Sequence, residues 1–140
     1  MIKGKKMGSF KDIEEARSFF KKDRFATENG MRIDELDDEH SLCSMELWDS
    51  HKNANDGIMG GVIYTLADFA FAALVCNIHN PTVAQQVSMN FLSAPRGKKL
   101  FARAECRKDG RTSTIVTVDV TDEKGNDVAL FTGTDRKSVV

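Results

Sequence analysis

The sequence predicts one α+β domain in which an antiparallel sheet wraps around a single long helix. Residues 60–78 read GGVIYTLADFAFAALVCNI, and a helix that is apolar on nearly every face has to be enclosed. From residue 82 onward, apolar residues recur with a period of two between turn signals, which predicts a meander of three or four strands. The chain has the size of one domain and shows no repeat or linker, so 1–140 is taken as a single domain.

The elements before the long helix are short. Residues 11–22 place apolar side chains at helical spacing with charges on the other face, which predicts an amphipathic helix within a basic N-terminal segment, 1–24. Residues 31–36 and 41–48 are mixed in character, and we expect them to be extended. The turn-rich sequence HKNAND and several glycines precede the long helix, which is expected over about 61–77.

Four later runs predict strands: TVAQQVSMNFL, KLFARAECRK, TSTIVTVDV and DVALFTGTD. The pair Asp109-Gly110 is a tight-turn signal, and the sequence DEKGN separates the last two runs. A sheet that ends in long regular strands leaves an edge of unpaired backbone groups, which a second subunit can cover by pairing. We therefore expect a dimer.

The composition argues against several classes of protein. A net charge of −1 gives no support to a nucleic-acid or membrane partner held by bulk electrostatics. The N-terminus, MIKGKKMGSF, lacks the apolar core of a signal peptide, and the 60–78 run is short for a bilayer and carries Asp68 at its centre. We expect a cytoplasmic protein. The three cysteines have no CxxC spacing, which favours buried free thiols over a zinc site.

Asp68 is the feature of the long helix that demands an explanation. Between Asp56 and Arg96 it is the only residue that carries a full charge at neutral pH, and burial of an unpaired carboxylate is costly. Three interpretations are open: a general base or nucleophile in an apolar pocket, a structural carboxylate bonded to a backbone N–H or to Tyr64, or a wet helix face. Apolar surroundings raise the pKa of a carboxyl group and make it a better base near neutral pH, which favours the first.

Polar groups also bracket the start of the helix. Asn53 and Asn55 lie in the preceding loop, and Gly60 and Gly61 open the first turn. The first N–H groups of a helix have no internal partner, and a glycine lets a ligand oxygen approach them directly. Such a site can hold a carbonyl group and stabilise the oxyanion that forms when the carbonyl is attacked. The alternative is that the glycines only permit close packing.

Other chemically capable residues show weaker patterns. His40, His51 and His79 have no triad or metal spacing, so surface or capping roles are expected. Cys76 on the long helix fits a small core residue better than a nucleophile. Basic residues gather around the later strands, where they form either a solvated face or a phosphate-binding patch: Lys98, Lys99, Arg103, Arg107, Lys108 and Arg111.

Several motifs occur in order and at matching spacing from about residue 40 to the C-terminus. They are Asn53, the Gly60-Gly61 pair, the LADFAFA segment, the NFL-x-x-P-x-G stretch over 90–97 and the K-x-G-R-T turn over 108–112. In this combination the sequence resembles the hotdog-fold acyl-CoA thioesterases of the phenylacetate-pathway (PaaI) type. The resemblance implies a long central helix wrapped by a curved antiparallel sheet. It also implies homodimers that join through sheet edges, often paired into homotetramers, with active sites at the subunit interface.

The resemblance further implies roles for individual residues. The acidic residue of the helix matches Asp68 and activates water or attacks the thioester carbonyl. The backbone N–H that polarises this carbonyl matches Gly60, and the loop asparagine that helps to place the nucleophile or water matches Asn53. Asp68 would face Asn53 of the partner subunit and Gly60 of the partner subunit. A polar residue of the strand after the helix often assists, which points to Gln85 or Gln86.

The function implied is hydrolysis of an acyl-CoA thioester to a free acid and coenzyme A, without a metal or redox cofactor. Met59 and Gly61 would lie beside the substrate carbonyl, and the acyl group would lie near Tyr64 and Phe71. The nucleotide phosphates of coenzyme A would bind Lys108, Arg111 and Thr112.

One position departs from the family pattern. The family usually has a histidine immediately before the glycine pair, whereas this chain has Met59, which neither titrates nor donates a strong hydrogen bond. A non-catalytic acyl-CoA-binding or sensing protein is therefore one alternative function. A hotdog enoyl-CoA hydratase or dehydratase is another, although no histidine stands near the Asp68 motif.

Overall fold

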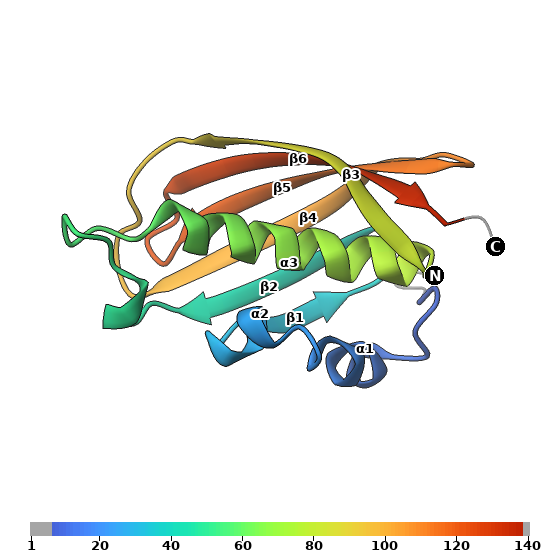
Figure 1. The fold of residues 1–140 in the computed structure, drawn as a ribbon, viewed down its shortest axis with the longest axis horizontal. Helices are drawn as coiled ribbons and strands as arrows, with labels where there is room; N and C mark the ends of the chain where they lie inside the picture. Colours follow the sequence, from blue (N-terminus) through green and yellow to red (C-terminus); the bar gives the residue numbers. More distant parts are fainter. Residues whose placement is uncertain (1–6, 139–140) are drawn as a thin grey trace.

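The computed structural model describes residues 7–138, in which one helix lies along one face of a six-stranded antiparallel sheet (Figure 1). The segment 1–6 of the predicted basic N-terminus lies outside the described residues. The elements, in chain order, are α1 Ile13–Phe20, α2 Arg24–Glu28, β1 Arg32–Leu36, β2 His40–Glu46, the 3₁₀ turn η1 Asp49–His51, α3 Gly60–Ile78, β3 Thr82–Phe91, β4 Lys99–Asp109, β5 Ser113–Asp122 and β6 Asp127–Lys137.

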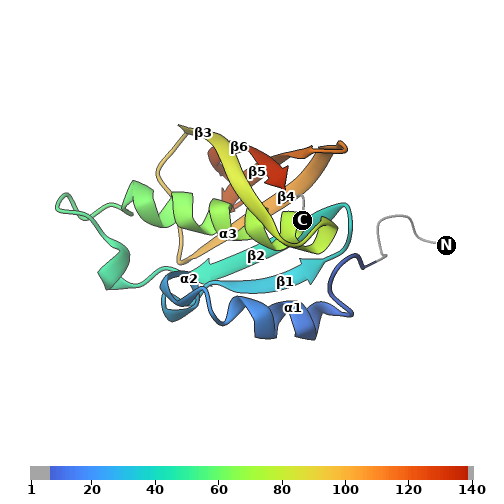
Figure 2. The ribbon, with the colours of Figure 1, turned by 45° about the vertical axis from the view of Figure 1, so that its right-hand side comes forward.

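The strand order across the sheet is β1-β2-β4-β5-β6-β3 (Figures 1 and 2). The predicted meander is confirmed for β4, β5 and β6, which pair in sequence order. The first strand of the predicted meander, β3, instead pairs with β6 and forms an edge of the sheet. Because β3 is an edge strand, its predicted apolar face is only partly covered, and Val83 and Phe91 are 59% and 57% exposed.

Helix α3 provides the centre of the core. It packs against β4, β2 and β5, and Leu66, Ala70 and Leu74 are completely buried. Phe71 fits against β6 at Gly133, where an added Cβ atom would lie 2.7 Å from the phenylalanine ring. Although α3 is long and apolar enough to cross a membrane, 56% of its apolar window is buried inside the protein. The sheet therefore covers one side of α3, and full burial of each large apolar side chain on that side contributes about 1.5–3 kcal/mol.

The predicted N-terminal helix over 11–22 is confirmed as α1, whereas α2 follows it and was not predicted; both helices lie beside β1 (Figure 2). Asp12 caps α1 by accepting a hydrogen bond from the Glu15 N–H at 2.9 Å. Phe20 of α1 packs edge-on against Phe69 of α3, with ring centroids 5.7 Å apart. This contact holds the N-terminal helices against α3 and brings α2 over the middle of that helix.

Candidate active site

Asp68 lies at the middle of α3 in a pocket of about 370 Å³. The pocket wall on the α3 side is made of Thr65, Asp68 and Phe69. The opposite wall comes from α2 and the residue before it: Asp23, Arg24, Phe25 and Ala26. This volume falls within the usual range for small-molecule sites, and the Asp68 carboxylate is one of the groups that line it.

The Asp68 carboxylate is partly buried and has no hydrogen bond or ion pair with any of residues 7–138. Burial raises the pKa of Asp68 above its ordinary value, and the negative charge of Asp23 raises it further. Tyr64 is close enough for the charge of Asp68 to raise the pKa of the phenol, but the two side chains form no hydrogen bond. The structural interpretation, a carboxylate fixed by a backbone N–H or by Tyr64, therefore finds no support within this chain.

The two glycines open α3, as the sequence predicts. Met59 is the N-cap residue, and its own N–H donates to the His51 carbonyl at 2.9 Å. The N–H groups of Gly60 and Gly61 have no hydrogen-bond partner among residues 7–138, as expected for the first residues of a helix. An added Cβ at Gly60 would meet the Phe91 ring at 3.4 Å, and one at Gly61 would meet Met59 at 3.9 Å. Both are ordinary contacts, so close packing alone does not require glycine here.

Asn53 organises the loop before α3. Its Oδ1 accepts hydrogen bonds from the N–H groups of Asn55 at 2.9 Å and Gly57 at 3.1 Å, which closes the turn. Its amide nitrogen makes no hydrogen bond within residues 7–138 and belongs to an exposed side chain. The Asn53 side chain can therefore hold the loop through its oxygen and still donate a hydrogen bond through its nitrogen.

A single subunit does not bring these groups together. Gly60 and Asp68 are eight residues apart on one helix, which places them about 12 Å apart along its axis. A carbonyl group bound at the Gly60 N–H is therefore out of reach of the Asp68 carboxylate of the same chain.

Tyr64 and Phe71 do not line the Asp68 pocket. Both turn toward Phe131 on β6, with ring centroids 5.8 Å and 5.5 Å from it. Phe71 is only 2% exposed. The Phe71 ring is part of the core between α3 and the sheet, and the expected acyl contact near Tyr64 and Phe71 stays a prediction.

The remaining predicted site residues are exposed and lie apart from the pocket. Gln85 is at a bulge in β3, and Gln86 donates its side-chain N–H to the Val87 carbonyl at 3.2 Å. Lys108, Arg111 and Thr112 lie in or beside the β4–β5 turn. This turn is near the C-terminal end of α3, whereas Gly60 is at the other end (Figure 1). Within one subunit, the structure therefore does not bring Lys108, Arg111 and Thr112 close to Gly60.

His51 is buried, at 2% exposure, and has the capping role that the sequence left open, because its ring caps the 3₁₀ turn η1. Its Nδ1 accepts the Trp48 N–H at 2.8 Å, its Nε2 lies 3.1 Å from the Asn29 side-chain oxygen, and the Trp48 ring stacks on it. Burial lowers the pKa of His51, which favours a neutral ring whose Nε2–H donates to Asn29. His51 therefore joins the end of α2 to the loop that carries Asn53 and Gly60.

Two alternative chemistries are not supported by the described residues. Burial, followed by the charges of Asp135 and Asp23, raises the pKa of Cys76 to about 12, so its thiol is a poor nucleophile. Within residues 7–138, no three His, Cys, Asp or Glu side chains are grouped as metal ligands. The reactive group in the Asp68 pocket is therefore the carboxylate.

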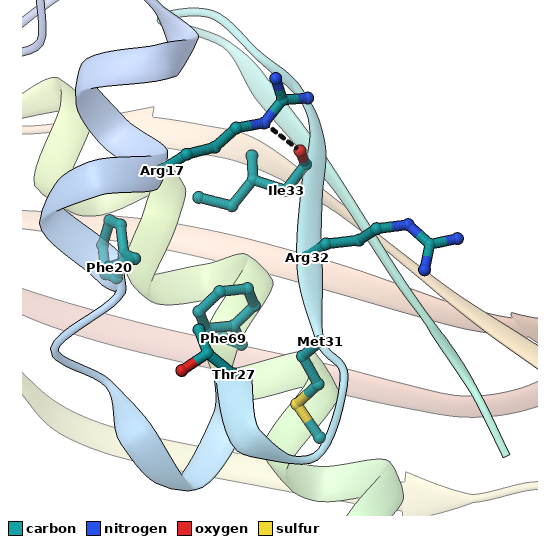
Figure 3. A pocket seen from close by; sticks show the side chains of 7 residues that line it. All are labelled: Arg17, Phe20, Thr27, Met31, Arg32, Ile33 and Phe69. Atoms are coloured by element: carbon teal, nitrogen blue, oxygen red, sulfur yellow. Dashed lines mark hydrogen bonds between the residues drawn. The ribbon is translucent and has the colours of Figure 1, made fainter. Parts of the chain in front are cut away.

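A second pocket, of about 200 Å³, lies between α1, α2 and β1 (Figure 3). Its lining is mostly apolar and contains no carboxylate: Arg17, Phe20, Thr27, Met31, Arg32, Ile33 and Phe69. The Arg17 Nε donates to the Ile33 carbonyl at 2.9 Å, and this bond lies along the pocket wall. Because the volume is below the usual range for a complete ligand, the Asp68 pocket is the better candidate for the active site.

Two features of the Asp68 pocket could not be found from the sequence. The first is α2, a five-residue helix that is too short to show a clear period. The second is Asp23, which lines the pocket because α2 contacts α3. The acidic residue directly before a short helix is the only local signal, and it is equally typical of an N-cap.

Comparison with known proteins agrees with this architecture. The model of the thioesterase superfamily matches residues 56–129, more than half of the chain. Acyl-coenzyme A thioesterase PaaI of Escherichia coli (strain K12) is 28% identical over 127 residues, covering 89% of this chain and 90% of that protein. Human acyl-coenzyme A thioesterase 13 is 29% identical over 85 residues, covering 59% of this chain and 61% of that protein.

Solved structures show the same fold. The Escherichia coli PaaI structure superposes with a TM-score of 0.83 at 24% identity, covering 89% of this chain and 91% of that one. A hypothetical thioesterase of Streptococcus pneumoniae TIGR4, solved with coenzyme A, superposes with a TM-score of 0.76 at 27% identity, covering 85% and 99%. The fold is therefore the hotdog fold. The chain belongs to the thioesterase superfamily, which confirms the expected fold class and the expected class of enzyme.

Proposed function

We propose that this protein hydrolyses an acyl-CoA thioester to a free acid and coenzyme A, with Asp68 as the general base or nucleophile. The observation that carries the proposal is a partly buried carboxylate without hydrogen-bond donors, in a pocket of about 370 Å³. The relatives named as acyl-coenzyme A thioesterases and the structure solved with coenzyme A support this choice of substrate.

The chemistry assigns one task to each group. The Gly60 N–H holds the thioester oxygen and stabilises the oxyanion, because it is a helix N-terminal donor without an internal partner. As a general base, Asp68 takes a proton from water, and the hydroxide adds to the carbonyl carbon. As a nucleophile, its carboxylate adds to that carbon directly, and the mixed anhydride that is left on Asp68 is then hydrolysed by water, which releases the free acid and restores the carboxylate. In either case the C–S bond breaks and coenzyme A leaves as the thiolate, which then takes up a proton.

We infer further that the active site is built by two subunits. The separation of about 12 Å between Gly60 and Asp68 along one helix supports this, because the two groups act on the same carbonyl. Edge strand β3 also supports a site built by two subunits. Exposed apolar side chains lie on this strand and beside it: Met59, Val83, Phe91 and Leu92. In such a dimer the carbonyl bound at Gly60 of one subunit meets Asp68 of the other.

A thiol-release assay over a panel of short, long and aromatic acyl-CoAs tests the proposed function. We expect one or more of these substrates to be hydrolysed by the wild type and none to be hydrolysed at a comparable rate by Asp68→Asn. Equal rates for the two proteins on a good substrate would sink the role of Asp68. Circular dichroism and size-exclusion chromatography of the variant serve as controls for folding and assembly.

A non-catalytic acyl-CoA-binding protein is the second candidate, and the observation that favours it is Met59. Its side chain is 51% exposed and does not cap α3, so it stands where a histidine would meet the substrate but offers no donor. Acyl-CoA binding by calorimetry without any thiol release across the panel would establish this alternative and rule out the hydrolase.

A further inference from the structure

Asp23 faces the same pocket as Asp68 without serving the local structure around it. It is the N-cap residue of α2, yet its side chain forms no capping hydrogen bond. The Thr27 N–H and the Thr27 hydroxyl both donate to the Asp23 backbone carbonyl instead, each at 3.0 Å. By contrast, the N-cap residue of α1, Asp12, caps its helix with its carboxylate. The Asp23 carboxylate is therefore available to the pocket.

Among residues 7–138, no cation forms an ion pair with either carboxylate. Arg24 is the cation that lines the pocket, and its Nε lies 2.6 Å from the Glu28 carboxylate, which it pairs with along α2. On α3, Tyr64 is the titratable neighbour of Asp68. No strand residue is among those that line the pocket. Asp23 and Asp68 are thus two acidic side chains that line one pocket, and no paired cation neutralises either of them.

Two carboxylates that share a partly desolvated pocket disfavour their doubly ionised state. When one of them takes up a proton, the charge on the other stabilises the protonated form. Burial also raises the pKa of Asp23 itself, so both groups hold protons more strongly than free aspartates do. A general base benefits from such a neighbour, because its proton affinity is raised toward that needed at neutral pH.

We propose that Asp23 is a positioning residue for the hydrolysis, which stabilises Asp68 in its protonated form after the base has taken a proton from water. This inference rests on the proposed function. In the step concerned, an O–H bond of water breaks, the proton moves to an Asp68 oxygen, and the hydroxide adds to the thioester carbon. The proton then passes from Asp68 to the departing thiolate, so Asp23 stabilises the intermediate charge state without gaining or losing an atom.

The pH dependence of kcat/KM in the wild type, Asp23→Asn and Asp23→Glu tests this role. Without the charge of Asp23, Asp68 ionises at lower pH, so the acid limb of the Asp23→Asn profile should move down by about half a pH unit or more. Activity at neutral pH should fall, because Asp68 becomes a weaker base. Asp23→Glu should restore most of the wild-type profile. Asp119→Asn is the matched control, because Asp119 is an exposed carboxylate on β5 that does not line the pocket.

A ¹³C NMR titration of the Asp68 carboxyl group separates this inference from the proposed function. If the wild type hydrolyses no acyl-CoA, the function fails, and the titration still shows whether Asp23→Asn lowers the pKa of Asp68. If hydrolysis occurs but the wild-type and Asp23→Asn profiles coincide, the function stands and the role of Asp23 is overturned. If Asp23→Asn loses activity at every pH while the acid limb of its kcat/KM profile stays in place, the proposed role is likewise overturned, and Asp23 has only a structural role.

Discussion

Two aspartates of this chain, Asp122 and Asp68, have opposite environments. In the β5–β6 turn, Asp122 accepts hydrogen bonds from the N–H of Arg96 at 2.7 Å, the N–H of Lys124 at 2.9 Å and both the backbone and side-chain nitrogens of Asn126. These donors lower the pKa of Asp122 to about 2 despite the opposing effect of burial. Asp68 has no such donors in the part of its chain that the structure describes, and its pKa is raised, first by burial and then by the charge of Asp23.

The difference shows how the same side chain becomes structural at one place and reactive at another. Donors fix Asp122 as a permanent anion that holds the segment before β4 against the turn. Asp68 keeps its lone pairs free and its proton exchangeable, which a base requires. Asp135 shows that a raised pKa alone is not sufficient. Burial raises the pKa of Asp135 to about 6, although the charges of His79 and Lys137 oppose the shift, yet Asp135 lines neither of the two pockets around α2.

The largest effect should come from mixing two inactive variants. The partners of Asp122 all belong to its own chain, whereas those of Asp68 are proposed to come from the other subunit. Asp68→Asn should lose about 10²–10⁴-fold in kcat, and Asn53→Ala should also be impaired. After subunit exchange, each mixed dimer has one intact site, so the mixture should recover about a quarter of wild-type activity.

A mixture of Asp68→Asn with Asp68→Ala is the control for this experiment, because it contains no intact site in any combination. Native mass spectrometry of mass-tagged subunits shows whether exchange has taken place. Mixed dimers that form fully but stay inactive would contradict a site shared between subunits.

Replacement of Asp135 should change stability rather than catalysis. The pKa of Asp135 is raised in the folded protein, so ionisation of this buried carboxyl opposes folding as the pH rises from about 4 to about 6. Asp135→Asn removes that cost and should raise the free energy of unfolding at pH 7 by about 1–3 kcal/mol. Urea denaturation at pH 4 and pH 7 measures this, and an equal effect of the substitution at both pH values would refute the explanation.

The Asp122→Ala substitution should have the opposite dependence on pH. Because the folded pKa of Asp122 is lowered, its stabilising contribution is present above the ordinary pKa of an aspartate and is lost as the pH falls toward about 2. The variant should be less stable than the wild type at pH 7, and the two should converge in acid. Thermal denaturation between pH 2 and pH 7 tests this, with thiol release per folded molecule expected to stay unchanged.

The smallest effect is expected at Met59. An added histidine donor next to the substrate carbonyl is worth about one ordinary hydrogen bond, so Met59→His should raise kcat/KM by less than about tenfold. The side chain is exposed, so the melting temperature should not change. Met59→Leu is the matched control without a donor. A drop in activity for the histidine variant alone would show that this chain requires an apolar side chain at the position.

The sequence was most informative where a pattern is local. The apolar run of α3 predicted an enclosed helix with one charged residue, and period-two alternation predicted the four long strands. The pairing of β3 with β6 depends on how the chain turns back across the sheet, and no local pattern encodes that choice. The burial of His51 likewise depends on Asn29, a residue 22 positions away in sequence.

The candidate site was only half predictable for the same reason. Asp68 and Gly60 stand out because their residue types are unusual in an apolar helix and at its start. Asp23 does not stand out, since its role arises from the packing of α2 over α3. The packing of Phe71 against β6 was not predictable either, because an aromatic residue on a helix that is apolar on nearly every side gives no sign of which side faces the sheet.

The most direct test of the central claim compares the two aspartates in one experiment. In a ¹³C NMR titration of the wild-type carboxyl groups, assigned with Asp68→Asn and Asp122→Asn, Asp122 should titrate near pH 2. Asp68 should titrate above the ordinary aspartate value of 3.8, and binding of a non-hydrolysable acyl-CoA analogue should perturb Asp68 and leave Asp122 unchanged. An Asp68 pKa at or below 3.8, with no response to the analogue, would contradict the assignment of Asp68 as the catalytic carboxylate.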